Sequence, residues 1–134
     1  MSVTYIIPCN PIAWKRAGNS RGRFYDQQSH TKINTAIYIK NQHDGTFYEN
    51  VPLLLTITFY FPIPQTWSKK RKDAMADMPH IFIPDTDNCV KFILDCLSTV
   101  IFKDDCQVSD IIAKKRYDDG NGARTEFTLT VVEL

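Results

Sequence analysis

The stretch from Asn88 to Thr99 limits more than any other feature how this chain can fold. Its spacing predicts a helix that is apolar on almost every side, and such a helix is normally buried. The polar side chains in and just before it, Asp87, Lys91 and Asp95, recur every four positions and therefore share one stripe. A buried helix needs a covering layer, which the strands of the chain are expected to supply. Sequence alone leaves open whether its apolar sides face the core or a partner.

Short apolar runs bounded by proline, glycine and polar turns predict the strands of that layer. The order β-α-β-α-β-β favours an α+β fold, with one mixed or antiparallel sheet and helices packed on it. We expect strands over 3–7, 51–61, 107–117 and 124–132, helices over 29–42 and 88–99, a polar loop over 14–28, and a short basic helix that Ser68 caps and that ends near Met78. In the helix over 29–42, the side chains expected to face inward are Ile33, Ala36, Ile37 and Tyr38.

Length and composition favour one intracellular domain. The 134 residues, taken as a single domain over 1–134, have the length of one domain and an ordinary globular composition. No apolar run approaches the roughly 18–20 residues of a membrane span, and no secretion signal is apparent. The four cysteines form no CxxC pair, which favours reduced thiols. A cytoplasmic protein without a membrane partner is therefore expected.

Charge is distributed unevenly along the chain, although its net value is only +1. The first 42 residues carry six basic side chains against one acidic, whereas residues 75–110 carry two against seven. Basic segments that flank a carboxylate cluster suit a polyanionic substrate processed with metal ions. Taken singly, each basic residue is as readily a solvated surface charge. As a group, the candidates for DNA contact are Lys15, Arg16, Arg21, Arg23, Lys69, Lys70, Arg71 and Lys72.

Carboxylates stand on both sides of the buried helix. Asp85 and Asp87 lie in its extended approach, where residues i and i+2 point the same way, and Asp105 is expected to open the next strand. Clustered carboxylates repel one another, and their stable use is to bind a hard cation such as Mg²⁺ or Mn²⁺. Bound in this way, the metal activates water for phosphodiester cleavage. Lys91, roughly 6 Å along the helix from Asp87, can neutralise charge that develops on the scissile phosphate.

Further polar residues are expected to orient these groups. Asp95 lies about 12 Å along the helix from Asp87, too far to share one ion directly, so we expect it to orient Lys91. Beside it, the supporting set comprises Asn88, Asp104 and Gln107.

A simpler interpretation stays open for the same residues. Asp87, or its neighbour Asn88, can be a plain helix N-cap, Asp85 a solvated loop residue, and Lys91 part of a surface ion-pair stripe. Their concentration around a helix that should be buried favours a functional site. A calcium loop of the EF-hand type does not fit, because Val90 stands where that loop needs glycine.

Three spaced stretches carry a family resemblance. Residues 84–88, 91–95 and 102–108 have the sequences PDTDN, KFILD and FKDDCQV. Together they resemble the signature PDxDN…KxxLD…YKDDxQV of the RusA family of Holliday junction resolvases, many of them encoded by phages or prophages. The segments WKR at 14–16, RFY at 23–25 and WSKKR at 67–71 are similar to further parts of that family. The resemblance covers most of the chain.

The resemblance implies a RusA-like α+β fold and a homodimeric, Mg²⁺-dependent endonuclease that introduces paired nicks into four-way DNA junctions. By motif position, Asp85, Asp87 and Asp105 match the family's metal-binding aspartates, and Lys91 matches its catalytically important lysine. The chain departs from the family at Ser98-Thr99, where many members have an Asn-Gly-like turn, and at Ile83, where a basic residue often precedes the Pro-Asp pair.

Three functions remain open on the sequence alone. The first is an endonuclease that resolves Holliday junctions in recombination and repair, and the second is a nuclease with a broader taste for branched or flapped DNA. The third is a junction-binding protein without catalysis, which the presence of all three aspartates and Lys91 disfavours. A four-way junction has approximate two-fold symmetry, and a two-fold dimer would offer it two equivalent sites.

Overall fold

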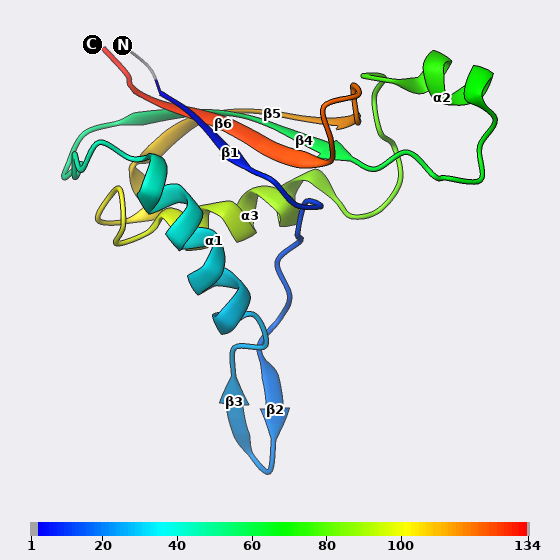
Figure 1. The fold of residues 1–134 in the computed structure, drawn as a ribbon. Coiled ribbons are helices and arrows are strands. Elements are labelled where there is room, and N and C mark those ends of the chain that lie inside the picture. The colour runs from blue at the N-terminus through cyan, green and yellow to red at the C-terminus, as the bar shows by residue number, and fades with distance from the viewer. Residues whose placement is uncertain (1–2, 134) are drawn as a thin grey trace.

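A four-stranded sheet with two long helices on one of its faces forms the body of the protein (Figure 1). A computed structural model describes residues 3–133, with the side chain of Phe24 left out. The order of strands in the sheet is β1-β6-β4-β5, and β2 and β3 form a separate hairpin. The expected α+β class with a mixed sheet is confirmed. The elements are β1 (Thr4–Ile7), β2 (Gly18–Ser20), β3 (Arg23–Tyr25), α1 (Ser29–Gln42), β4 (Leu53–Phe61), α2 (Lys69–Met75), α3 (Thr86–Leu97), the 3₁₀ turn η1 (Asp105–Gln107), β5 (Val108–Tyr117) and β6 (Arg124–Val131).

The central strand β4 organises the sheet. Every second side chain along it, from Leu53 to Phe61, is buried on the face that carries the helices. β6 runs antiparallel to β4, whereas β5 runs parallel to it and forms an edge of the sheet. Parallel neighbours need a crossover connection. The chain between β4 and β5 supplies it and contains both α2 and α3.

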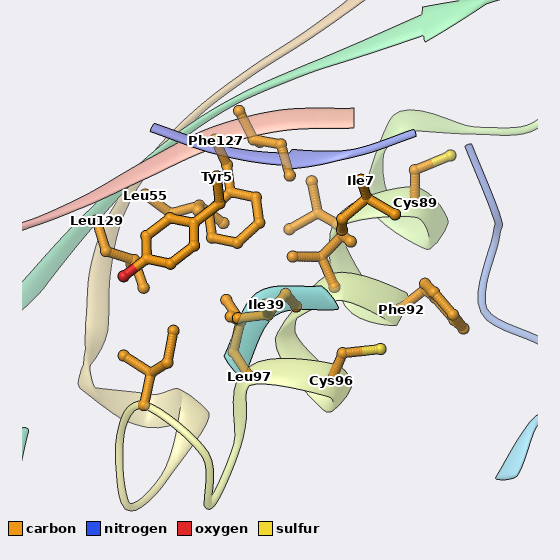
Figure 2. Packing of buried hydrophobic residues seen from close by; sticks show 14 of the residues in the cluster. Tyr5, Ile7, Ile39, Leu55, Cys89, Phe92, Cys96, Leu97, Phe127 and Leu129 are labelled. Atoms are coloured by element: carbon orange, nitrogen blue, oxygen red, sulfur yellow. The ribbon is translucent and has the colours of Figure 1, made fainter. Parts of the chain in front are cut away.

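The helix α3 packs against α1, β5 and the turn η1, and its expected burial is confirmed. Its buried side chains include Phe92, Cys96 and Leu97. Figure 2 shows side chains of α3 and Ile39 of α1 gathered beneath the strands that carry Tyr5 and Phe127. The rings of those two residues stack with centroids 4.8 Å apart. The apolar sides of α3 therefore serve the core of the protomer.

The inward face of α1 differs from the prediction. Ile33, Ile37 and Tyr38, which were expected to face the core, are exposed. The buried residues of this helix are Thr35 and Ile39, because the stripe that faces α3 and β1 also contains polar side chains. Thr35 can lie there because its hydroxyl group donates a hydrogen bond to the carbonyl oxygen of Thr31, 2.9 Å away. Apolar spacing was therefore a poor guide to a helix that buries such a narrow stripe.

A hairpin formed by β2 and β3 occupies part of the segment that was expected to be a loop. Arg21 and Gly22 join its strands, and both have positive φ angles of 52° and 77°. Two successive positive φ angles fit the tight turns whose twist matches paired strands. The ring of Tyr25 covers Gly18 so closely that a Cβ atom at Gly18 would lie 2.4 Å from the ring carbon Cζ. Figure 1 shows the hairpin projecting away from the sheet.

Two boundaries between β4 and β5 also differ from the prediction. The helix α2 ends at Met75 rather than near Met78, although Ser68 caps it as expected through a 3.2 Å hydrogen bond from the amide of Arg71. Asp105 does not open a strand, because η1 comes first and β5 begins at Val108. Within residues 3–133, no helix has the length and apolar content that crossing a membrane requires.

Candidate active site

Asp85 and Asp87 stand at the N-terminus of α3. The N-cap position belongs to Asp85 rather than to Asp87 or Asn88, and the Asp85 side chain makes no capping hydrogen bond. Asp87 follows within the first turn of the helix, so the two residues do not lie in one extended segment as expected. Both are exposed, and no basic side chain within residues 3–133 pairs with either. The positive end of a helix favours carboxylates at this place.

Lys91 lies one turn further along α3. Its ammonium nitrogen is 4.6 Å from the centroid of the Trp14 ring, which is a cation–π contact. A shallow groove of about 410 Å³ runs between this part of α3 and the edge strand β5. The groove has an apolar floor, and its polar lining residues include Asp87 and Lys91. Its lining residues are Thr86, Asp87, Val90, Lys91, Leu94, Ile111 and Ala113.

Asp95 does not hold Lys91, which corrects the sequence-based expectation. Its carboxylate oxygen lies 3.2 Å from the ammonium nitrogen of Lys32 on α1. The same ammonium group lies 2.9 Å from the carboxylate of Asp26, in the segment between the hairpin and α1. The polar stripe of α3 is thus divided: Lys91 lies against Trp14, in the segment before the hairpin, and Asp95 lies against α1.

The turn η1 carries the remaining acidic residues. The Asp104 carboxylate accepts a 3.0 Å hydrogen bond from the amide of Cys106. The side-chain oxygen of Gln107 accepts hydrogen bonds from the amides of Lys103 and Asp104, and its amide nitrogen donates to the carbonyl oxygen of Tyr48 at 3.2 Å. Asp104 and Gln107 therefore build the turn that carries Asp105, and their supporting role in a site stays a prediction.

Asp105 is electrostatically tied to the polar side of α3. A hydrogen bond with the Asp104 carboxyl group raises the pKa of Asp105, and the charges of Asp104 and Asp95 add to this effect. The Lys91 ammonium group acts in the opposite direction. Figure 1 shows that β5, which follows η1, starts near the end of α3 rather than near its beginning. Asp105 is thus linked to Lys91 and Asp95, while Asp85 and Asp87 stand at the helix N-terminus.

The donor set of the protomer fits a divalent ion through two carboxylates. In the part of the chain that the structure describes, no three histidine, cysteine, aspartate or glutamate side chains are close enough together to hold a metal. Magnesium, however, is usually bound by one or two carboxylates and fills its other positions with water and phosphate oxygens. Asp85 and Asp87 supply two such oxygen donors on exposed side chains. The structure does not bring Asp105 into one cluster with them.

The basic candidates fall into two groups at different ends of the molecule (Figure 1). Lys15 and Arg16 precede the hairpin, whose turn contains Arg21 and whose second strand contains Arg23. All four are exposed. The second group belongs to α2, on which Lys69, Lys70 and Arg71 are exposed and Lys72 is half-buried.

Arg71 is held against an aromatic ring. Its guanidinium carbon lies 3.8 Å from the centroid of the Trp67 ring. This contact orders one end of the basic helix, because a planar guanidinium group stacks well on an aromatic face. Sequence reasoning found both basic groups but not the contacts that fix the first, which come from Trp14, Gln28 and Lys32. Their polar or aromatic character alone gave no signal of that role.

His80 lies among aromatic rings of the strands β4 and β5. Its ring stacks on Phe61 with centroids 4.2 Å apart and meets the edge of Tyr117 at 5.0 Å. Its buried Nδ1 atom has no hydrogen-bond partner within residues 3–133. Burial lowers the pKa of His80 from its ordinary value, and the nearby positive charge of Lys115 lowers it further.

The stability of the fold should therefore depend on pH through His80. Because the pKa of His80 is lower in the folded protein, the unfolded chain takes up the proton at a higher pH than the folded protein as the pH falls below the ordinary histidine value of 6.5. We expect the free energy of unfolding to decrease between pH 7 and pH 5 and to decrease less in His80→Phe, measured by urea unfolding at each pH. His30→Gln, an exposed histidine on α1, is the control and should keep the wild-type slope. Equal slopes for His80→Phe and the wild type would contradict this.

Comparison with known proteins finds a matching family. A sequence profile of the family Endodeoxyribonuclease RusA matches residues 8–130. The chain is 30% identical over 113 residues to a protein of Lactococcus phage r1t named crossover junction endodeoxyribonuclease rusA, covering 79% of this chain and 77% of that protein. It is 32% identical over 85 residues to the uncharacterized protein YqaN of Bacillus subtilis strain 168, covering 60% of each. The match spans the hairpin, both helix termini of α3 and η1, and the chain therefore belongs to the RusA family of endodeoxyribonucleases.

Proposed function

We propose that this endonuclease resolves Holliday junctions in DNA recombination and repair by paired, symmetric nicks, and that it needs Mg²⁺, with Mn²⁺ as a substitute. The observation that carries the proposal is the pair of exposed carboxylates, Asp85 and Asp87, at the start of α3. Asp87 is one helical turn from Lys91, and Figure 1 shows the start of α3 between the hairpin and α2, which carry the two basic groups. The relative from Lactococcus phage r1t is named for crossover junctions, which favours this substrate.

In this proposal the residues have distinct tasks. Asp85 and Asp87 hold the divalent ion. Asp105, which lies outside this pair in the free protein, is proposed as a third carboxylate that joins them when the ion binds. When bound, the ion supplies an activated water and stabilises the leaving oxygen. Lys91 directs its ammonium group at the scissile phosphate and offsets the negative charge that develops there. Three residues support these groups: Asn88 in the first turn of α3, and Asp104 and Gln107, which build the turn η1.

The basic groups position the DNA. Contacts from lysine and arginine to phosphates fix the register of the duplex without reading its sequence. Two groups at different ends of one protomer can engage two different arms of a branched substrate, which a single patch could not do. In a homodimer, the two-fold symmetry of the junction would meet two equivalent sites. Such a protein would act in the bacterial cytoplasm, and the phage relative favours a phage or prophage origin.

The first experiment compares DNA structures under matched conditions. The protein is incubated with strand-labelled four-way junctions, flaps, forks and linear duplex, each with Mg²⁺ and with EDTA. Paired nicks that appear only with Mg²⁺ and only in the junction would support the proposal. Equal cutting of flaps and forks would favour the broader branched-DNA nuclease. Tight junction binding without nicks in either Mg²⁺ or Mn²⁺ would favour a non-catalytic binder.

The basic helix α2 should contribute to affinity through phosphate contacts. Each phosphate neutralised adds about 0.9 to the slope of log affinity against log salt. The double variant Lys69→Ala/Lys70→Ala should therefore bind the junction about tenfold more weakly and flatten that slope by up to about 2. Fluorescence anisotropy over a salt series measures both quantities.

A matched control separates local contact from total charge. Lys40→Ala/Lys114→Ala removes the same charge from exposed residues at the end of α1 and on β5. It should keep a slope close to that of the wild type. A wild-type slope in the α2 variant would remove α2 from the DNA interface.

A further inference from the structure

The segment between β1 and β2 is fixed against the beginning of α3. The backbone amide of Trp14 donates a 2.9 Å hydrogen bond to the carbonyl oxygen of Asn88. Figure 1 shows this part of the chain passing the N-terminal end of α3 before it descends to the hairpin. The Trp14 side chain is half-buried and packs against the core. Its position relative to α3 is therefore set by both backbone and side chain.

A buried glutamine fixes the same segment from the other side. Gln28, only 5% exposed, accepts a 2.8 Å hydrogen bond from the amide of Lys15 and donates one of 2.8 Å to the carbonyl oxygen of Ala13. Its amide group thus mimics a neighbouring strand. Because Ala13 and Lys15 flank Trp14, the backbone on both sides of the tryptophan is held in place.

The Trp14 ring is directed at Lys91. The ammonium nitrogen lies 4.6 Å from the ring centroid, within the range of a cation–π contact. No carboxylate within residues 3–133 forms an ion pair with Lys91, since Asp95 is paired with Lys32. The aromatic face is thus the contact that restricts this long and otherwise flexible side chain.

We propose that Trp14 is a positioning residue, which holds the Lys91 ammonium group in place and links it to the basic segment that follows. Lys15 and Arg16 come directly after Trp14 in the chain. DNA that binds these two residues therefore contacts the same short segment whose tryptophan holds Lys91 in place. The link to catalysis rests on the proposed function, in which Lys91 acts on the scissile phosphate. The contact itself can be tested without any nuclease activity.

The first test is spectroscopic. The chain has two tryptophans, so Trp67→Phe leaves Trp14 as the single tryptophan emitter. In that background, Lys91→Met removes the charge beside the ring and should shift the Trp14 emission maximum, whereas Lys103→Met should not. No DNA or metal is present. An unchanged spectrum after Lys91→Met would overturn the proposal even if the protein proves to be a junction nuclease.

The second test separates binding from cleavage. Trp14→Leu keeps an apolar side chain but removes the ring, so the nicking rate at saturating enzyme should fall about tenfold while junction affinity stays within about twofold. Trp14→Phe should recover most of the rate because it restores an aromatic face. Tyr38→Leu, an exposed aromatic residue on α1, should cut at the wild-type rate.

A double variant decides between positioning and a purely structural role. If Trp14 acts through Lys91, adding Trp14→Leu to Lys91→Met should slow nicking no further. The proposal would be overturned if the rate losses of the two single variants multiplied in the double variant. It would also be overturned if Trp14→Leu nicked at the wild-type rate. Should Trp14→Leu not fold, the spectroscopic test and the Trp14→Phe rate still decide: a rate loss in Trp14→Phe as large as that in Lys91→Met would count against the proposal. A wild-type protein that cuts no junction refutes the proposed function but leaves the spectral shift intact.

Discussion

Asp87→Asn is expected to slow junction nicking at least about a thousandfold and to leave junction binding intact. Asparagine keeps the shape of the side chain but removes the negative charge that a hard cation requires. Because Asp87 is exposed in the first turn of α3 and caps nothing, its replacement should not disturb the fold. Binding is expected to be equal or tighter, since a carboxylate that repels phosphate is removed. Single-turnover nicking and anisotropy binding, both with Mg²⁺, measure the two effects.

The matched control is Asp110→Asn on β5. Asp110 is also exposed, but it pairs with Leu54 on β4 and lies on the face of the sheet opposite the helices. It should cut at the wild-type rate. Nicking by Asp87→Asn at a rate near that of the wild type would show that the metal site has been assigned to the wrong residues. Loss of binding together with nicking would instead indicate that Asp87 supports the local fold.

The features that sequence predicted well are those in which one physical requirement dominates. The helix over 88–99 has almost no polar side, so burial was its only stable solution, and α3 is buried as expected. The long apolar run that ends at Pro62 was predicted as a strand over 51–61, and β4 occupies Leu53–Phe61. Ser68 before a run of helix-forming residues gave the start of α2. The sequence also placed Asp85 and Asp87 at the start of this helix, where the structure has them, while their role stays a prediction.

The features that sequence missed depend on partners that are distant along the chain. Whether Asp95 turns to Lys91 or to Lys32 depends on how α1 crosses α3, which no local pattern encodes. The contact between Lys91 and Trp14 joins residues on a helix and on a loop far from it in sequence. The hairpin was missed because its turn uses Arg21 at positive φ, where asparagine or glycine is the usual signal. Polar turns and side-chain pairing, rather than core packing, thus limited the prediction of the site.

Arg124, at the start of β6, holds together the turn that follows β5. Its guanidinium group donates two hydrogen bonds of 3.0 Å to the Asp119 carboxylate and one of 2.6 Å to Glu126. It also lies 3.9 Å from the centroid of the Tyr60 ring on β4. The hydrogen bonds from Arg124 to Asp119 lower the pKa of this carboxyl group from 3.8 to about 2, and a hydrogen bond from the backbone amide of Asn121 acts in the same direction. Arg124 is only 7% exposed, and these partners offset the cost of burying its charge.

Arg124→Met should therefore cost about 1–3 kcal/mol of the free energy of unfolding, because it removes hydrogen bonds to two half-buried carboxylates and leaves them without their counter-ion. Urea unfolding at pH 7 measures the loss, and Lys114→Met, an exposed residue on β5, should cost little. The pKa of Asp119 is lowered from 3.8 to about 2, so its ion pair contributes stability above pH 3.8 and loses it as the pH falls towards 2. The difference in the free energy of unfolding between Arg124→Met and the wild type should become smaller over that pH interval. A difference that stays constant down to pH 2 would mean that packing on Tyr60, rather than the ion pairs, holds this turn. A loss at pH 7 no larger than that of Lys114→Met would mean that the turn contributes little to the fold.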